Sequence, residues 1–172
     1  MSTRSLVMVV VDKQVKIAQY GDSDGYPSVE GVNVLGFLNK IQGRKAEIVD
    51  KIRKIEFYTA KELDKAATQN HPELNLSASE ILHYLLDHDV KKVVNSSDFA
   101  NDSLFCQWCY VIDFDKSTFE VYKGLNKKPL YSIDRFYNKG THKSAYYPVK
   151  IVKSFNLNNL PSDAEFTDIV HE

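Results

Sequence analysis

Apolar residues fill both alternating sets of positions in residues 4–11, the first apolar segment of the chain. A short run of this kind, rich in valine, is typical of a strand that is buried on both faces. The polar residues 12–14 indicate a turn, and residues 15–20 predict a second strand. With a three-residue turn between the strands, Val11 lies opposite Val15 and the two strands form a hairpin.

The pattern changes to helical spacing after this hairpin. Pro27 is favourable at the start of a helix, and an apolar stripe predicts a helix that runs to about Lys40. The stripe consists of Val29, Val32, Leu35 and Leu38. After Gly43, a second helix is predicted, and its apolar face carries Ile48, Ile52 and Ile55.

Two later segments have the spacing of a capping box. In this motif a serine or threonine side chain and a glutamate three residues later bond the free N–H groups at a helix start. Thr59 with Glu62 and Ser77 with Glu80 have this spacing, so a short helix is expected at each.

The chain then returns to strand patterns and ends in a helical one. We expect strands over 105–114, 118–123 and 147–155, the first two as a second hairpin, and a last helix over 161–170. The order of strands, helices and strands predicts an α+β fold, in which an antiparallel sheet is built from an N-terminal and a C-terminal hairpin, with a central group of short helices. The length predicts a single domain over residues 1–172.

Composition narrows the possible functions. Hydrophobic residues make up 43% of the chain, which is enough for a core, and the formal net charge is -1, so no overall field attracts nucleic acid. The longest apolar run is too short to cross a bilayer and no signal segment leads the chain, so we expect a cytoplasmic protein that does not bind a membrane. Gly-x-Gly-x-x-Gly, Walker and His-Glu-x-x-His patterns are absent, and we expect no cofactor.

The most distinctive segment covers residues 20–31, which hold three carboxylates, three glycines and a proline. Extending the hairpin register puts Arg4 opposite Asp22 and Ser2 near Asp24, so the N-terminus and this acidic segment share one end of the hairpin. The simplest interpretation is structural: Arg4 pairs with Asp22, and Asp24 caps backbone amides.

A catalytic interpretation uses the same residues. A small polar residue after the initiator methionine is able to act as a nucleophile, with its own α-amine as the base. Ser2 and Asp24 are similar to the opening of choloylglycine-type N-terminal-nucleophile amidohydrolases, which have a nucleophile at position two and an Arg-Asn-x-x-Asp element after the hairpin. The resemblance implies catalytic roles for Ser2, Arg4 and Asp24, with Arg4 in place of the missing arginine and serine in place of the usual cysteine.

A third interpretation is a metal site. Asp22, Asp24 and Glu30 offer the oxygen ligands that Mg²⁺ prefers, as in a metal-dependent phosphodiesterase or nuclease. The residue pattern of the twelve-residue calcium loop is not matched.

Two other polar clusters are expected to be structural. Cys106 and Cys109 lack the second ligand pair of a zinc site, and a strand pattern places them on opposite faces. His83 and Asp87 share one helix face, but the apolar stripe of that helix lies elsewhere, so they form its solvated side. His88 lies near the C-terminal end of the same helix, where a cation is favourable.

An aromatic and basic segment near the end of the chain is a candidate binding surface. Tyrosines alternate there with the basic residues Arg135, Lys139, His142, Lys143 and Lys150. This mixture is typical of surfaces that bind a protein or single-stranded nucleic acid, and the alternative is a strand edge whose tyrosines cover the core. Together with the acidic segment, the predicted binding residues are Asp22, Asp24, Tyr26, Glu30, Tyr137, Tyr146 and Tyr147.

Several stretches resemble small proteins that phages and prophages encode: the opening Thr3-Arg4, residues 20–27, and the hairpin segments 110–114 and 119–124. The resemblance implies a mobile-element setting, where small accessory proteins, including anti-CRISPR proteins, bind and block a host system. It therefore implies a host protein or ribonucleoprotein as partner and an inhibitor of a host defence factor as the function. The oligomeric state stays open.

Overall fold

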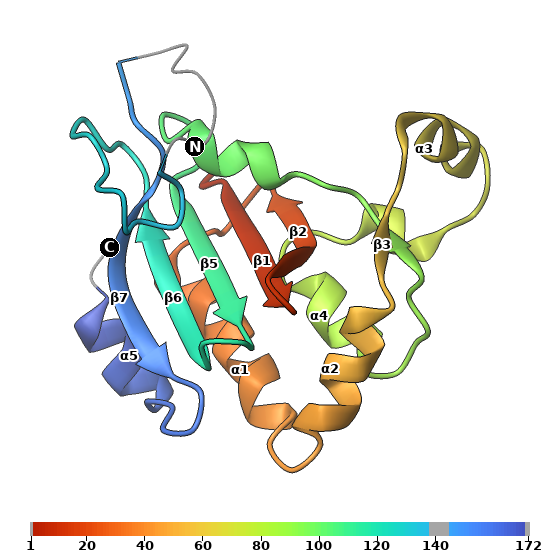
Figure 1. Cartoon of the computed structure of the whole chain (residues 1–172), viewed down its shortest axis with the longest axis horizontal. Helices are drawn as coiled ribbons and strands as arrows, with labels where there is room; N and C mark the ends of the chain where they lie inside the picture. The colour runs from red at the N-terminus through yellow and green to blue at the C-terminus, as the bar shows by residue number, and fades with distance from the viewer. Residues whose placement is uncertain (1, 138–144, 171–172) are drawn as a thin grey trace.

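A five-stranded mixed sheet with the order β2-β1-β5-β6-β7 forms the centre of the computed structural model, which describes residues 2–137 and 145–170 (Figure 1). Its strands are β1 Ser5–Val11, β2 Gln14–Gly21, β5 Trp108–Asp113, β6 Thr118–Lys123 and β7 Lys150–Asn156. β1 runs parallel to β5, whereas the other neighbouring strands are antiparallel. The predicted α+β class is correct, but the predicted antiparallel sheet is wrong.

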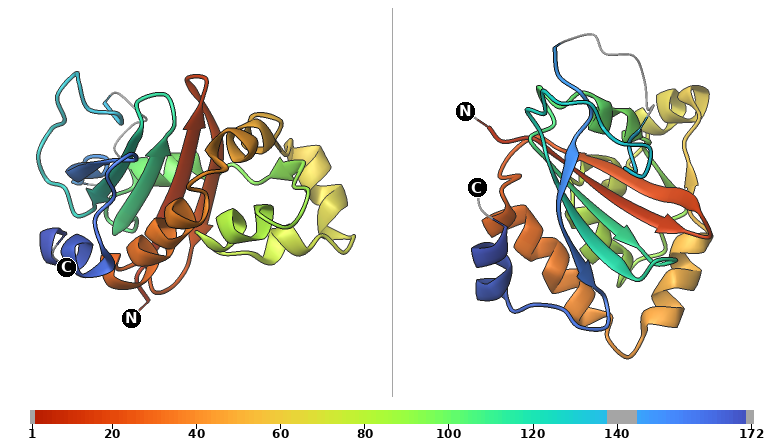
Figure 2. Two further views of the ribbon diagram at one scale, coloured as in Figure 1. Left: turned by 90° about the horizontal axis from the view of Figure 1, so that it is seen from below. Right: turned by 60° about the vertical axis from the view of Figure 1, so that its left-hand side comes forward.

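Helices cover one face of this sheet (Figures 1 and 2). They are α1 Val32–Lys40, α2 Lys45–Arg53, α4 Glu80–Leu85 and α5 Asp163–Ile169. Val7 and Tyr110 of the sheet share a buried cluster with Phe37 of α1 and Phe166 of α5. The first three of these helices lie between β2 and β5 in the chain, and this helical crossover lets β5 enter the sheet parallel to β1. No described helix has both the length and the apolar character needed to span a membrane.

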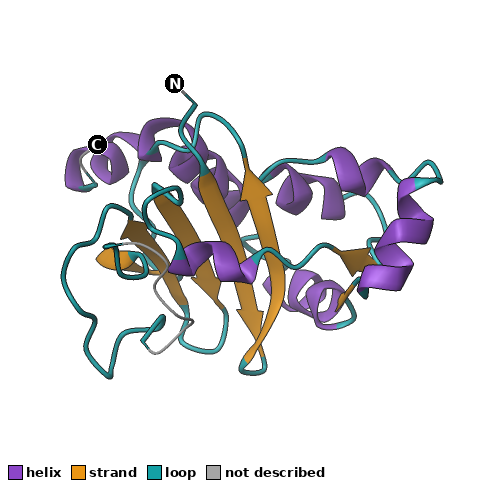
Figure 3. Cartoon of the chain, turned by 90° about the horizontal axis from the view of Figure 1, so that it is seen from above, coloured by secondary structure: helices purple, strands orange, loops and turns teal. Residues whose placement is uncertain are grey.

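Loops cover the opposite face (Figure 3). We call residues 97–101, 125–137 and 145–149 the loop layer; the first of these ranges is the short helix η3 Ser97–Asn101. Leu6 and Met8 of β1 lie in a second buried cluster with Leu130 and Phe136 of this layer. Because β1 has a strand on each side and a covered layer on each face, all seven of its residues are buried, as the sequence predicted.

The turn of the first hairpin is tighter than predicted. Asp12 and Lys13 have φ angles of 54° and 62° and form a two-residue turn, a type whose twist matches that of the flanking strands. Val11 therefore pairs with Gln14 and not with Val15. Both backbone N–H groups of this turn donate to the carboxylate of Asp115, so the two hairpin turns are tied together.

The start of the first predicted helix also differs. Residues Pro27–Gly31 form a π-helical turn, η1, which is wider than an α-helical turn. Val29 is consequently 42% exposed, and the predicted apolar stripe fails at this position. Leu35 and Leu38 in α1 are buried, as predicted.

A smaller unit lies beside β2 and consists of β3 Glu56–Phe57, α3 Ala60–Ala67, η2 Pro72–Asn75 and β4 Lys92–Val93. Thr59 and Glu62 form the predicted capping box at the start of α3. The box predicted at Ser77 is absent at the start of α4, where the backbone N–H of Ser79 donates to the carboxylate of Glu30.

Candidate functional site

The N-terminus and the acidic segment meet through their backbones. The N–H of Gly25 donates to the carbonyl of Thr3 at 2.9 Å, and the buried hydroxyl of Tyr110 donates to the carbonyl of Gly25 at 2.7 Å. A Cβ atom at Gly25 would lie 2.8 Å from the Cβ of Ser5 and 2.9 Å from the carbonyl oxygen of Thr3. The close approach of the two segments therefore requires glycine at this position.

The side chain of Arg4, one of the proposed catalytic residues, contacts an aromatic ring. Its guanidinium carbon lies 5.5 Å from the centre of the Phe105 ring. Ser2, Asp22 and Asp24 are exposed. The ion pairs formed by residues 2–137 and 145–170 do not join Arg4 to either aspartate. The geometry thus brings the predicted segments together without assembling a catalytic group from their side chains.

Glu30 lies inside the molecule, with only 7% of its surface exposed. Its Oε1 accepts a hydrogen bond from the N–H of Ser79 at 2.6 Å. Burial raises the pKa of Glu30, although the hydrogen bond from Ser79 acts in the opposite direction. Within the described ranges, no group of three or more His, Cys, Asp or Glu residues could hold a metal ion, so Asp22, Asp24 and Glu30 do not form a magnesium site.

The two cysteines are free, fully buried and part of the same cluster under the loop layer. The prediction that they face opposite sides of a strand is wrong, because β5 begins only at Trp108 and its alternation does not reach Cys106. Burial raises the pKa of both the Cys106 and the Cys109 thiols. Neither is therefore suited to act as a nucleophile at neutral pH.

His83 links two helices and is not simply a solvated residue. Its Nε2 lies 3.0 Å from the carbonyl oxygen of Asn33, and its ring packs edge-on against Phe37 of α1. His88 stacks on Tyr84, with 3.9 Å between the ring centres. These contacts give both histidines structural roles.

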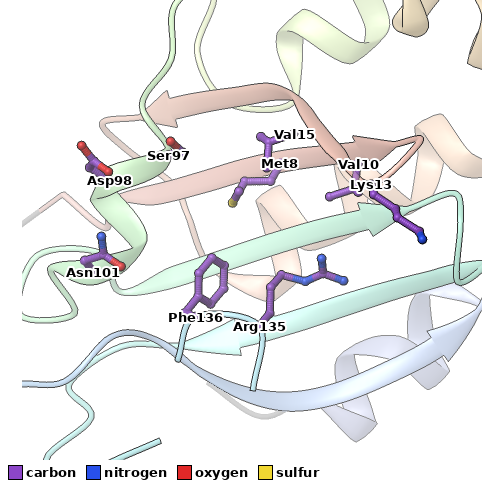
Figure 4. Close-up of a pocket in the computed structure, with 9 residues that line it drawn as sticks. All are labelled: Met8, Val10, Lys13, Val15, Ser97, Asp98, Asn101, Arg135 and Phe136. Carbon is purple, nitrogen blue, oxygen red and sulfur yellow. The ribbon is translucent and has the colours of Figure 1, made fainter. Parts of the chain in front are cut away.

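A cavity of about 360 Å³ lies between the sheet and the loop layer (Figure 4). Met8, Val10 and Val15 of the first hairpin line one side, and Asn101 and Phe136 of the loop layer line another. The volume is within the range of small-molecule sites. The Oδ1 atom of Asn101 is buried and has no hydrogen-bond partner in the described part of the chain. None of the nine lining residues is a histidine or a cysteine.

Arg135, which also lines this cavity, is held by two carboxylates of the sheet. Its Nη2 lies 2.7 Å from Oδ2 of Asp113, and its Nε lies 2.9 Å from Oε1 of Glu120. The hydroxyls of Tyr122 and Thr118 also donate to Glu120, at 2.6 and 2.7 Å. This network joins the loop layer to β5 and β6.

Both carboxylates of the network stay ionised although they are buried. Burial by itself would raise the pKa of Glu120, but hydrogen bonds from Arg135, Tyr122 and Thr118 lower it below its usual value. For Asp113, too, burial is outweighed by donors, mainly the backbone N–H of Lys116 and the guanidinium, and its pKa is lowered. Since both groups are ionised and engaged, the network is suited to holding the loop layer rather than to proton transfer.

The predicted tyrosine-rich segment is described in part. Tyr137 is exposed, the ring of Tyr146 lies 5.6 Å from the ammonium of Lys127, and the N–H of Tyr147 donates to the carbonyl of Asn126. Lys139, His142 and Lys143 lie outside the described residues.

Exposed apolar side chains gather in and beside the loop layer. Eight of the twelve large exposed apolar residues in the described part of the chain come from this region. Tyr131 and Ile133 are the most exposed, at 70% and 90%. We call the eight residues the loop surface: Leu104, Phe105, Leu125, Tyr131, Ile133, Tyr137, Ile151 and Val152.

Among these residues, the sequence predicts Tyr137 as a binding residue and places Tyr131 in the aromatic and basic segment, but it does not single out Phe105, Leu125 or Ile133. A usable signal exists for Leu125, which is a lone apolar residue in the polar segment 123–128. Phe105 falls in the strand predicted over 105–114, but β5 begins only at Trp108, so Phe105 precedes the strand.

Comparison with protein-family models, curated proteins and solved structures gives no match to this chain, so its function has to be argued from its own geometry.

A first prediction concerns the contact between the N-terminus and the acidic segment. Gly25→Ala is expected to lower the free energy of unfolding by about 1–3 kcal/mol, because the new Cβ displaces backbone. Gly36→Ala is the matched control: a Cβ there meets nothing within 4 Å, and alanine in α1 should stabilise by about 0.5–1 kcal/mol. Urea unfolding measures both, and equal effects would contradict the predicted close approach.

A second prediction concerns the Arg135 network. Arg135→Met leaves two buried carboxylates without their counter-charge, so it should lower the free energy of unfolding at pH 7 by about 3–5 kcal/mol. Arg53→Met is the control, since Arg53 also pairs with two carboxylates, Asp12 and Asp50, but at an exposed site. It should have little effect.

The same network predicts a pH dependence. The pKa values of Asp113 and Glu120 are lowered by folding, so their contribution is present above about pH 4.5 and is lost as the pH falls through their folded values. In Arg135→Met, burial without the guanidinium raises these pKa values. The stability difference between wild type and variant should therefore shrink from pH 7 to pH 3 in urea unfolding, and a constant difference would exclude this electrostatic account.

Proposed function

We propose that this chain is a binding protein that acts through its loop surface on a host protein or ribonucleoprotein. The observation that carries the proposal is the concentration of exposed apolar side chains on one region. Contiguous exposed apolar patches are uncommon on monomeric proteins and mark interaction sites. Exposed tyrosine and isoleucine side chains beside lysines are also suited to contact with a protein partner.

The loop surface is held firmly enough to serve as an interface. Arg135, Leu130 and Phe136 fix its long segment to the sheet. The backbone N–H of Tyr131 donates to the carboxylate of Asp134, which orders the turn that presents Ile133. Little conformational entropy then has to be lost on binding, which favours affinity.

The acidic segment lies at the same end of the sheet as this surface. Cross-strand pairing places Ser5, Trp108, Lys123 and Lys150 in one row. Three strand spacings, or about 14 Å, therefore separate the start of β1 from the start of β7. One partner of ordinary size could contact Asp22, Asp24 and Tyr26 together with the loop surface.

The proposed biological setting is a phage or another mobile element, and the proposed action is inhibition of a host defence factor in the bacterial cytoplasm. This part rests on the resemblance of the sequence to small phage and prophage proteins. The geometry supports the binding role over the amidohydrolase and phosphodiesterase alternatives. Among the described residues, Arg4 forms no ion pair with Asp24, and no group of three His, Cys, Asp or Glu residues could hold a metal ion.

The binding role predicts that Ile133→Glu reduces recovery of a host partner by about tenfold or more, because a charge then occupies the centre of an apolar contact. Ile169→Glu on α5 makes the same chemical change at a 45% exposed position outside the loop surface and should have no effect. The immobilised wild-type chain and both variants are incubated with bacterial lysate, and retained proteins are quantified by mass spectrometry. Absence of a partner enriched by wild type, or equal recovery by both variants, would count against the proposal.

The inhibitory role has a separate test. Expression of the wild-type chain in strains that carry a defence system should raise phage plating by at least about tenfold in one strain. Ile133→Glu should abolish the rise and Ile169→Glu should preserve it. Unchanged plating across restriction and RNA-guided systems would reject inhibition of these defences.

A further inference from the structure

β7 is an edge strand of the sheet, and its outer side is unpaired among the residues that the structure describes. The opposite edge strand, β2, is covered: the N–H of Ser96 donates to the carbonyl of Ala18, and the N–H of Ala78 donates to the carbonyl of Tyr20. In the described part of the chain, residues 150–155 make no backbone hydrogen bonds except those with β6. An edge of this kind has unpaired N–H and C=O groups that can pair with another strand.

A groove of about 420 Å³ lies at the start of β7, where residues 150–152 meet the end of β6 and the segment that follows it. Its nine lining residues come from segments 123–128 and 150–152 and include four lysines and no carboxylate. Leu125, Ile151 and Val152 supply its apolar part. The groove is therefore locally basic although the whole chain has a net charge of -1.

Ring contacts hold three of the groove lysines in place. The ammonium of Lys123 lies 5.2 Å from the centre of the Trp108 ring, and that of Lys150 lies 5.2 Å from the centre of the Tyr131 ring. Lys127 makes the similar contact with Tyr146. These contacts restrict side chains that are otherwise flexible, and so they preorganise the positive charge.

Asn126 fixes the wall of the groove. Its backbone N–H donates to the hydroxyl of Ser103, and its side-chain amide donates to the carbonyl of Pro148. Its Oδ1 accepts from the N–H of Lys128. The wall that carries Lys127 and Lys128 is thus bonded to two distant parts of the chain.

Three possible occupants can be compared on these observations. Single-stranded nucleic acid would stack its bases on aromatic rings, but a lysine already lies over one face of Tyr131 and one face of Tyr146, which leaves fewer faces for stacking. A second copy pairing through its own β7 would bring Lys150 and Lys153 close to the lysines of the first copy. An acidic extended segment of another protein satisfies both the open backbone edge and the lysines.

We propose that β7 and its lysine groove bind an extended acidic segment of the partner, which adds to the sheet as a sixth strand. Alternate side chains of such a strand face the groove, where carboxylates meet Lys123, Lys127, Lys128 and Lys150, while its backbone bonds to β7. This inference rests on the proposed binding function and specifies the chemistry of the partner.

The probe for the test is a fluorescein-labelled seven-residue peptide of alternating glutamate and valine, and binding is measured by fluorescence anisotropy. The peptide should bind wild type, and binding should weaken as salt rises. Lys127→Glu with Lys128→Glu should raise the Kd at least tenfold. Lys61→Glu with Lys65→Glu, the same charge change on the remote helix α3, should change it less than twofold (Figure 1).

Backbone methylation separates strand addition from simple charge attraction. One peptide carries N-methyl groups on its glutamates and another carries them on its valines. Only one of the two sets of N–H groups faces β7 in an added strand, so one methylated peptide should lose at least tenfold in affinity and the other should keep it. Equal binding by both would overturn strand addition.

Other results would also overturn the inference: no binding of the acidic peptide, equal binding of a lysine–valine peptide, tighter binding of a thymidine oligonucleotide, or dimerisation of the chain through β7 in sedimentation. If the peptide does not bind but a host partner is still recovered from lysate in an Ile133-dependent way, the acidic strand is rejected. The proposed binding function is then still supported. If the peptide binds but no host partner is recovered, the proposed function is rejected, while binding of an acidic segment at β7 is still supported.

Discussion

The pairing of the partly buried Arg135 guanidinium with two carboxylates is the interaction that holds the loop layer on the sheet. The carboxylates of Asp113 and Glu120 lie on neighbouring strands, and the guanidinium comes from a loop that has no regular structure of its own. A charged group is expensive to bury, and two carboxylates with one guanidinium are tolerable only because hydroxyl and backbone donors complete the shell. Breaking this network would release the segment that carries Tyr131 and Ile133.

The two faces of the sheet have different roles. The helical face buries large apolar residues and supplies most of the core. The other face is covered by a thin layer whose outer side carries the exposed tyrosine, isoleucine and leucine residues. A scaffold covered by helices on one side and by loops on the other leaves the loops available for recognition, which is where binding residues concentrate in many folds.

Charge is distributed unevenly at the end of the sheet where β1 begins. The acidic segment lies next to β1, and the lysine groove lies three strands away beside β7. The small net charge of the chain conceals this separation. A partner surface with both signs of charge would be oriented by it, because complementary charges contribute more to orientation and specificity than to affinity.

The local sequence determined the elements whose cause is local. The run of valines predicted β1, and the spacing of the isoleucines predicted α2. The capping box of Thr59 and Glu62 predicted the start of α3. Each of these elements depends on neighbours within a few residues. The local sequence also placed the N-terminus beside the acidic segment. The turn is tighter than predicted, but a register shift between Val9 and Val10 restores the predicted pairing of Val9 with Ile17. Tertiary structure decided the rest. Three contacts join residues far apart in the chain: the parallel pairing of β1 with β5, the hydrogen bond from Ser79 to Glu30, and the pairing of Arg135 with Asp113. No local pattern specifies which distant partner fills each of these places.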